Sequence, residues 1–142
     1  MHRSLVHGRQ GEAMMAISAV DCALWDLKGR HLGVPVYQLL GGPHKTKFRA
    51  YCSILFGDTP QETGELARRF AGEGFTAIKF GWGPMGQNED NDIALVAEAR
   101  RGAGPDIDVL VDAGQVWDWK TALARAERFA EHNIFWLEEP LQ

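Results

Sequence analysis

The sequence has little of what defines several protein classes. Its 142 residues include two cysteines, Cys22 and Cys52, with no CxxC spacing, so neither a zinc ribbon nor a disulfide-rich fold is predicted, and both are expected to be buried free thiols. No apolar run approaches the roughly 18 residues of a membrane span. Residues 1–11 lack the apolar core of a signal peptide. We therefore expect a cytoplasmic protein with no membrane partner.

Neither positive nor negative charge predominates in the sequence. The net charge is −4, and the longest runs of consecutive lysine or arginine are the arginine pairs at 68–69 and 100–101. Two isolated pairs on predicted helices are typical of solvated surfaces, so no nucleic-acid partner is expected. A composition that is 45% hydrophobic and 24% charged is that of a globular protein with a core.

What the sequence does contain is an alternation of short strands and helices. A helix is predicted first, at 12–28, ending at Gly29. The strands that follow are predicted at 48–54, 75–80, 107–111 and 134–137, and the helices between them at 59–71, 92–101 and 118–132. The helix at 59–71 opens on a Thr-Pro-Gln-Glu segment that is typical of an N-cap with a capping box. The last has Leu123, Ala126 and Ala130 along one apolar face.

This alternation predicts a parallel sheet built from βαβ units. Two closures remain open at this point, a doubly wound open sheet and a (β/α)₈ barrel. No GxGxxG motif follows any predicted strand, which argues against the dinucleotide-binding form of the open sheet.

Charged residues mark the carboxyl ends of three successive strands. Lys79 lies within the end of the second strand, Asp112 directly follows the third, and Glu138 and Glu139 follow the fourth. A single aspartate or glutamate at such a place is usually a turn residue or a helix cap. Three charged positions in register are harder to explain in that way, because the carboxyl ends of parallel strands are where α/β proteins carry out chemistry.

Side-chain alternation predicts which of these residues converge. Asp112 shares a face with Leu110, and Glu138 with Trp136, whereas Glu139 points to the other side. Two converging carboxylates repel unless a proton or a cation lies between them. An oxygen-only pair suits a hard cation such as Mg²⁺, and Lys79 would face the same site, where it could hold an anionic group.

Five segments together resemble one known family. They are residues 16–29 (AISAVDCALWDLKG), 39–42 (LLGG), 74–80 (GFTAIKF), 111–115 (VDAGQ) and 136–141 (WLEEPL). In this order they resemble the linking helix, the turn after it and the second, third and fourth barrel strands of the mandelate racemase/muconate lactonizing enzyme family, in the enolase superfamily. The resemblance covers about residues 12–142.

The resemblance implies a fold, a cofactor and residue roles. The fold would be the first half of a (β/α) TIM-like barrel at 47–142, after the helical end of a capping domain at 1–46. Members bind Mg²⁺ and remove the proton alpha to a carboxylate. Asp112 and Glu138 match the family's metal ligands, and Lys79 matches a lysine that contacts the substrate carboxylate. Glu139 and Gln115 would support the ligands from behind.

One departure from the family pattern bears on the reaction. Many members have Lys-x-Lys on the second strand, with the second lysine as a base, but here the segment is Lys79-Phe80-Gly81. Family members that resemble sugar-acid dehydratases often use a base from later strands instead. We therefore expect acid-sugar dehydration, rather than racemisation or cycloisomerisation. Trp82 could line the sugar pocket or simply pack in its loop.

A second departure concerns length. The strands that would carry the third carboxylate ligand and a histidine–aspartate base are absent, so the sequence is expected to be a fragment without turnover of its own. Half a barrel exposes two sheet edges, which favours homo-oligomers or paired halves. The sequence leaves open an inactive half of a sugar-acid dehydratase, a non-catalytic remnant or assembly module, and an open-sheet binding protein.

Overall fold

The computed structural model describes residues 11–142, which form two units divided between Phe48 and Arg49. The prediction about a signal peptide concerns residues that lie almost wholly outside this range. The first unit contains helix α1 (Glu12–Leu32) and the short helix α2 (Val36–Leu39). The prediction that the first helix ends at Gly29 was wrong, because α1 continues to Leu32, and Gly33 caps it with φ 67°. Gly29 is needed for close approach instead, since a Cβ there would lie 2.8 Å from the carbonyl oxygen of Val34.

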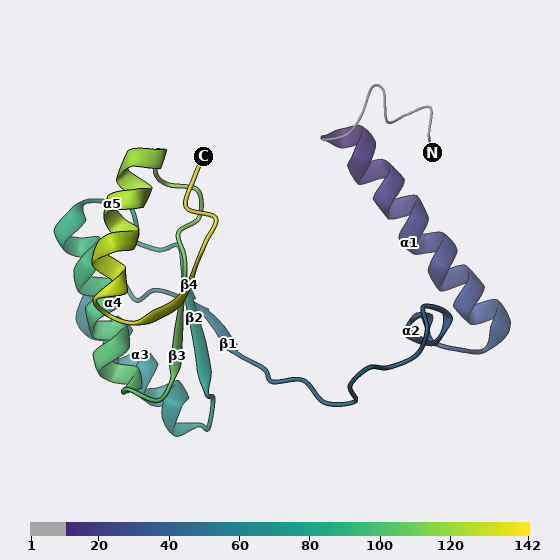
Figure 1. The fold of residues 1–142 in the computed structure, drawn as a ribbon, viewed down its shortest axis with the longest axis horizontal. Helices are drawn as coiled ribbons and strands as arrows, with labels where there is room; N and C mark the ends of the chain where they lie inside the picture. The colour runs from purple at the N-terminus through teal and green to yellow at the C-terminus, as the bar shows by residue number, and fades with distance from the viewer. Residues whose placement is uncertain (1–10) are drawn as a thin grey trace. The chain divides into compact units, whose positions relative to one another are not determined.

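The second unit is a four-stranded parallel sheet with helices between its strands. Its elements are β1 (Cys52–Leu55), α3 (Pro60–Gly72), β2 (Ala77–Gly81), α4 (Glu89–Ala103), β3 (Asp108–Asp112), α5 (Trp119–Ala130) and β4 (Ile134–Glu138). The strands follow one another across the sheet in chain order, β1-β2-β3-β4, and helices α3, α4 and α5 lie along one side of it (Figure 1). The predicted strand–helix repeat is confirmed.

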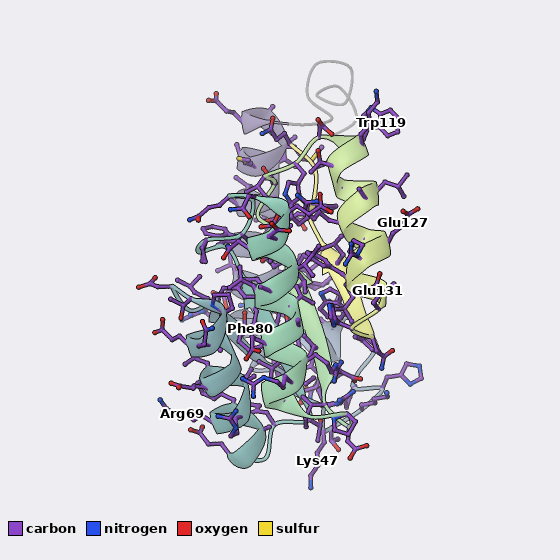
Figure 2. The ribbon with its side chains drawn as sticks, turned by 90° about the vertical axis from the view of Figure 1, so that its left-hand side faces the viewer. Lys47, Arg69, Phe80, Trp119, Glu127 and Glu131 are labelled. Carbon is purple, nitrogen blue, oxygen red and sulfur yellow. The ribbon has the colours of Figure 1, made fainter. Side chains whose placement is uncertain are left out.

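The core lies between the sheet and these three helices. Ile78 and Phe80 of β2 and Val109 and Val111 of β3 are fully buried, and they belong to one cluster with residues of the helices. Figure 2 looks onto the helices, with Phe80 labelled among the side chains beneath them. Because side chains alternate along a strand, Lys79, Leu110 and Asp112 belong to the opposite face, which the helices leave uncovered.

Polar caps fix where the helices begin. The hydroxyl of Thr59 accepts a hydrogen bond from the backbone N–H of Glu62 at 3.2 Å, as predicted, while the Glu62 carboxylate accepts from the N–H of Asp58, one residue before the expected one. Helix α4 begins earlier than predicted because Asn88 caps it, accepting from the N–H of Asn91 at 2.9 Å. Each cap satisfies a backbone donor that has no partner within the helix.

The predicted face of helix α5 was wrong. Leu123, which was expected on the apolar face, is 56% exposed, and the buried residues of this helix are Ala122, Arg125 and Phe129. The shift follows from Arg125, whose guanidinium reaches the fully buried carboxylate of Asp92 in α4 at 3.0 Å. A buried charge that is paired in this way can occupy an inward position that an apolar pattern would not assign to it.

Replacing Thr59 by alanine should lower the free energy of unfolding by about 1 kcal/mol, because the Glu62 N–H loses its acceptor. Urea denaturation followed by circular dichroism measures the change. Thr59→Ser keeps the hydroxyl and is the control, and we expect it to retain most of the stability. Equal losses in both variants would mean that the threonine methyl, and not the cap, stabilises α3.

The two cysteines differ in their surroundings. Cys52 is buried in β1, as predicted, and burial raises the pKa of its thiol. Cys22 is exposed, which corrects the prediction for it; it lies on α1, whose only buried residue is Gly29. Within residues 11–142, no helix is long and apolar enough to cross a membrane.

Candidate metal and substrate site

The strand register brings the predicted site residues to one end of the sheet. Gly81 pairs with Asp112 across β2 and β3, and Asp112 pairs with Glu138 across β3 and β4. Neighbouring residues in such a register project to the same side of the sheet. Lys79, two residues before Gly81, projects to this side as well. The convergence predicted for Lys79, Asp112 and Glu138 is therefore observed, at the carboxyl ends of the strands.

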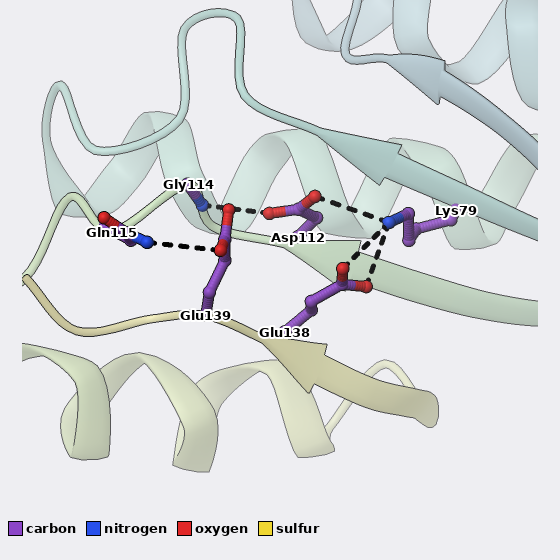
Figure 3. Close-up of polar contacts among 6 residues, drawn as sticks. All are labelled: Lys79, Asp112, Gly114, Gln115, Glu138 and Glu139. Carbon is purple, nitrogen blue, oxygen red and sulfur yellow. Dashed lines mark hydrogen bonds and ion pairs between the residues drawn. The ribbon is translucent and has the colours of Figure 1, made fainter. Parts of the chain in front are cut away.

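Lys79 lies between the two carboxylates. Its Nζ is 3.0 Å from both Oε1 and Oε2 of Glu138 and 3.4 Å from Oδ2 of Asp112 (Figure 3). The side chains of Lys79 and Asp112 are only 12% and 13% exposed, and that of Glu138 is 38% exposed. An ion triad with this little solvent is screened far less than a surface pair.

The carboxylates hold Lys79 in its charged form. The hydrogen bond to Glu138 raises the pKa of Lys79, and it outweighs the opposing effect of burial. The ring of Tyr51 adds to this environment, since its centroid lies 5.8 Å from the ammonium. The site therefore presents a permanent cation between two carboxylates at neutral pH.

Backbone N–H groups hold Asp112 in place through the oxygens that do not contact Lys79. Its Oδ1 accepts a hydrogen bond from the N–H of Gly114 at 3.1 Å, and its carbonyl oxygen accepts from the N–H of Trp82 at 3.2 Å. These bonds leave Oδ2 directed at Lys79. One oxygen of Asp112 is thus anchored and the other is available to a cation.

Glu139 and Gln115 lie on the side of Asp112 and Glu138 that is away from Lys79 (Figure 3). The side-chain Nε2 of Gln115 donates to Oε2 of Glu139 at 3.3 Å, and its backbone N–H donates to the Glu139 carbonyl at 2.8 Å (Figure 3). Both residues have positive φ, 62° for Gln115 and 33° for Glu139. Non-glycine residues adopt such angles only when their surroundings stabilise them. The pair fixes the loop after β3 to the end of β4.

A cavity of about 260 Å³ opens beside Lys79 and Asp112, and its lining also includes Gly81, Trp82 and the end of β1. A Cβ at position 81 would lie 3.3 Å from Oδ2 of Asp112, so a side chain there would press on the carboxylate. Trp82 is 58% exposed with φ 54°, and its ring lies against Gly114, where a Cβ would come within 2.8 Å of it. Trp82 both packs on its loop and borders the cavity.

Sequence reasoning missed two contributors to this site. Tyr51 directly precedes β1 and lies near Lys79, and Gly114 supplies the backbone donor to Asp112. Tyr51 could have been found, because it precedes Ser53 by two residues and Ser53 pairs with Lys79. The N–H of Gly114 carries no signal in a sequence, because every residue except proline has one.

The donor set fits a hard cation, but only in part. Two carboxylates on neighbouring strands already direct oxygens at one positive charge, which is the arrangement that Mg²⁺ prefers. No group of three or more histidine, cysteine, aspartate or glutamate side chains that could hold a metal occurs within residues 11–142. Asp112 and Glu138 are therefore the two carboxylates at this site that could hold such an ion.

Comparison with known proteins gives the site its context. Residues 62–142 match the enolase C-terminal domain-like family, and residues 1–41 match the mandelate racemase/muconate lactonizing enzyme N-terminal domain. The chain belongs to the enolase superfamily. It is 35% identical over 139 residues to D-galactarolactone cycloisomerase of Agrobacterium fabrum and 34% identical over 141 residues to D-gluconate dehydratase of Thermoproteus tenax, in each case over 94% of the chain.

A solved relative agrees in fold and contains magnesium. The mandelate racemase/muconate lactonizing protein of Paracoccus denitrificans, complexed with magnesium, is 36% identical and superimposes with a TM-score of 0.81 over 100% of this chain and 40% of its own. The prediction of the first four strands of an enolase-superfamily barrel is confirmed. The chain spans 36% and 28% of the length of the two curated relatives, which are enzymes.

Proposed function

We propose that this chain provides the first half of the active site of an Mg²⁺-dependent enzyme that removes the proton alpha to the carboxylate of a sugar acid. The observation that carries the proposal is the convergence of Lys79, Asp112 and Glu138 at the carboxyl ends of adjacent strands. A D-gluconate dehydratase and a D-galactarolactone cycloisomerase among the relatives support the substrate class. The same proposal assigns residues 1–46 to a capping domain and 47–142 to the barrel.

Asp112 and Glu138 would hold the metal. When bound, Mg²⁺ supplies Lewis-acid stabilisation of the negative charge that develops on the substrate carboxylate as the neighbouring proton leaves. The charged Lys79 would bind that carboxylate by a charge-assisted hydrogen bond. The Gln115–Glu139 bonds would keep Glu138 at the end of β4 in place, and Trp82 would border the space that the sugar chain enters.

Dehydration is the preferred reaction. Position 81, which faces the Asp112 carboxylate, carries no side chain, so this strand offers no second lysine to take a proton. Dehydration needs a protein base that removes the alpha proton and a proton donor for the departing beta hydroxyl. Later strands would supply both groups. Cycloisomerisation is the alternative, because one of the two curated relatives is a cycloisomerase.

Neutralising either proposed ligand should weaken metal binding. We expect Asp112→Asn and Glu138→Gln each to weaken Mg²⁺ binding to the 142-residue chain by about tenfold or more, because each removes one of two anionic ligands. Isothermal titration with Mg²⁺ alone measures the affinity. Glu139→Gln is the matched control, since it neutralises an adjacent carboxylate that points away from Lys79 while its amide oxygen can still accept from Gln115, and its effect should be small.

The outcomes separate the possible roles of the chain. Equal weakening by all three substitutions would indicate diffuse electrostatic binding and contradict the ligand assignment. With Mg²⁺ present, D-gluconate should bind the chain and uncharged D-glucose should not, as measured by ligand-observed NMR. No binding of either compound would favour a non-catalytic module. Turnover of D-gluconate by the isolated chain would contradict the expectation that the base lies on later strands.

A further inference from the structure

Lys79 already neutralises the residues proposed to hold the metal. All three of its short polar contacts are to carboxylate oxygens, two of Glu138 at 3.0 Å and one of Asp112 at 3.4 Å. The carboxylates repel each other, and the ammonium between them offsets that repulsion. The triad is an internally compensated ion cluster.

A divalent ion on the same oxygens would conflict with the ammonium. Like charges separated by a few ångströms repel strongly where solvent is scarce, and Lys79 and Asp112 are both nearly nine-tenths buried. Because Oδ1 of Asp112 is bound to Gly114, a metal ion would approach Oδ2, the oxygen that Lys79 already contacts at 3.4 Å. Repulsion between the two cations would then favour withdrawal of the ammonium as the divalent ion approaches.

Lys79 has room to withdraw. It lines the cavity of about 260 Å³ between the end of β1 and Trp82, and its side chain is a flexible four-carbon stem that carries a compact charge. The Tyr51 ring, 5.8 Å from the ammonium, offers a face that attracts a cation. The ammonium can therefore leave the carboxylates and remain within the site.

We infer that Lys79 is an internal counter-cation, which competes with the divalent metal for Asp112 and Glu138 and is released toward the substrate carboxylate when the metal binds. This inference rests on the proposed function and adds to it an order in which the metal and the substrate bind. Metal binding comes first, because until then the lysine charge is held by protein carboxylates and is poorly available to an anionic ligand. The substrate acid follows.

Removing the Lys79 charge should therefore strengthen metal binding. We expect Lys79→Met in the 142-residue chain to bind Mg²⁺ about tenfold more tightly than the unmodified chain, because the competitor is gone and the carboxylate repulsion is left for the metal to relieve. Lys79→Arg keeps the charge and should not bind more tightly. Lys120→Met removes an exposed lysine of α5 and controls for the change in net charge. Titration calorimetry with Mg²⁺ alone, and Mn²⁺ electron paramagnetic resonance, give the affinities.

A second measurement follows the lysine itself. In the unmodified chain, addition of Mg²⁺ should shift the Lys79 side-chain NMR signals, and Asp112→Asn should abolish the shift. If the chain binds Mg²⁺ but Lys79→Met binds it no more tightly than Lys120→Met does, the inference is overturned while the metal site stands. If neither the chain nor Lys79→Met binds Mg²⁺, the proposed metal site fails and the inference fails with it.

Discussion

Replacing Arg100 by methionine is expected to lower the free energy of unfolding by about 3 kcal/mol, because it leaves backbone acceptors without their donor. The guanidinium of Arg100 donates to four backbone carbonyl oxygens, those of Gly104 and Ile107 at 2.7 Å, Asn133 at 2.8 Å and His132 at 2.9 Å. These carbonyls belong to the segments that lead into β3 and β4. One side chain thus joins the end of α4 to the starts of two strands.

The neighbouring arginine is the matched control for this prediction. Arg101 is exposed, and among residues 11–142 its ion-pair partner is Glu98, one turn earlier on the same helix, so Arg101→Met should leave the stability close to that of the unmodified chain. Urea denaturation of both variants, followed by tryptophan fluorescence, makes the comparison. A similar loss in the two variants would show that helix propensity or net charge matters at this turn, and that the carbonyl contacts do not.

The two adjacent arginines show where sequence reasoning reached its limit. From the sequence, Arg100 and Arg101 formed a basic pair on a helix, and a solvated surface was the natural interpretation. That interpretation holds for Arg101 and is wrong for Arg100, which folds back over four carbonyls. The difference depends on His132 and Asn133, about thirty positions away along the chain, and a local pattern contains no information about contacts at that separation.

The candidate site was more predictable because it depends on strand ends. In parallel strands, the position of a charged residue relative to the end of the apolar run fixes how far along the sheet the residue lies and on which face its side chain projects. This reasoning placed Asp112 and Glu138 together and turned Glu139 away, as observed in Figure 3. It could not reveal that Lys79 would bind the carboxylates themselves, because that contact depends on side-chain conformation and on the charge balance of the assembled site.

Replacing Asp92 by asparagine is expected to produce the largest loss of stability, about 3–5 kcal/mol, because it removes the buried counter-charge of Arg125 and leaves only the exposed carboxylate of Glu89 beside it. The Asp92 side chain is fully buried, and its Oδ2 lies 3.0 Å from Nε of Arg125. Its Oδ1 accepts from the N–H of Gly86 at 2.7 Å, in the loop after β2 that carries Trp82. Asparagine can still accept that bond through its oxygen, but its NH2 group would then face Nε of Arg125, so the substitution removes both the charge and the acceptor of the Arg125 hydrogen bond.

Companion variants test whether the charge pair is the cause. Glu89, the other partner of Arg125, is 54% exposed, and Glu89→Gln should cost less than about 1 kcal/mol, as exposed ion pairs generally do. Asp92→Asn combined with Arg125→Met should cost clearly less than the sum of the two single substitutions, because the double variant no longer buries an unpaired charge. Chemical denaturation of the four proteins provides the cycle.

The same cycle decides what Asp92 contributes to the candidate site. If the single substitutions are strictly additive, Asp92 and Arg125 act independently, and the shift in the buried face of α5 needs another cause. If they couple as expected, Asp92 connects the packing of α4 on α5 with the loop that borders the Lys79 cavity. In that case Asp92→Asn should also change the fluorescence of the folded chain through Trp82, whereas Arg100→Met, which acts at the opposite end of the strands, should not.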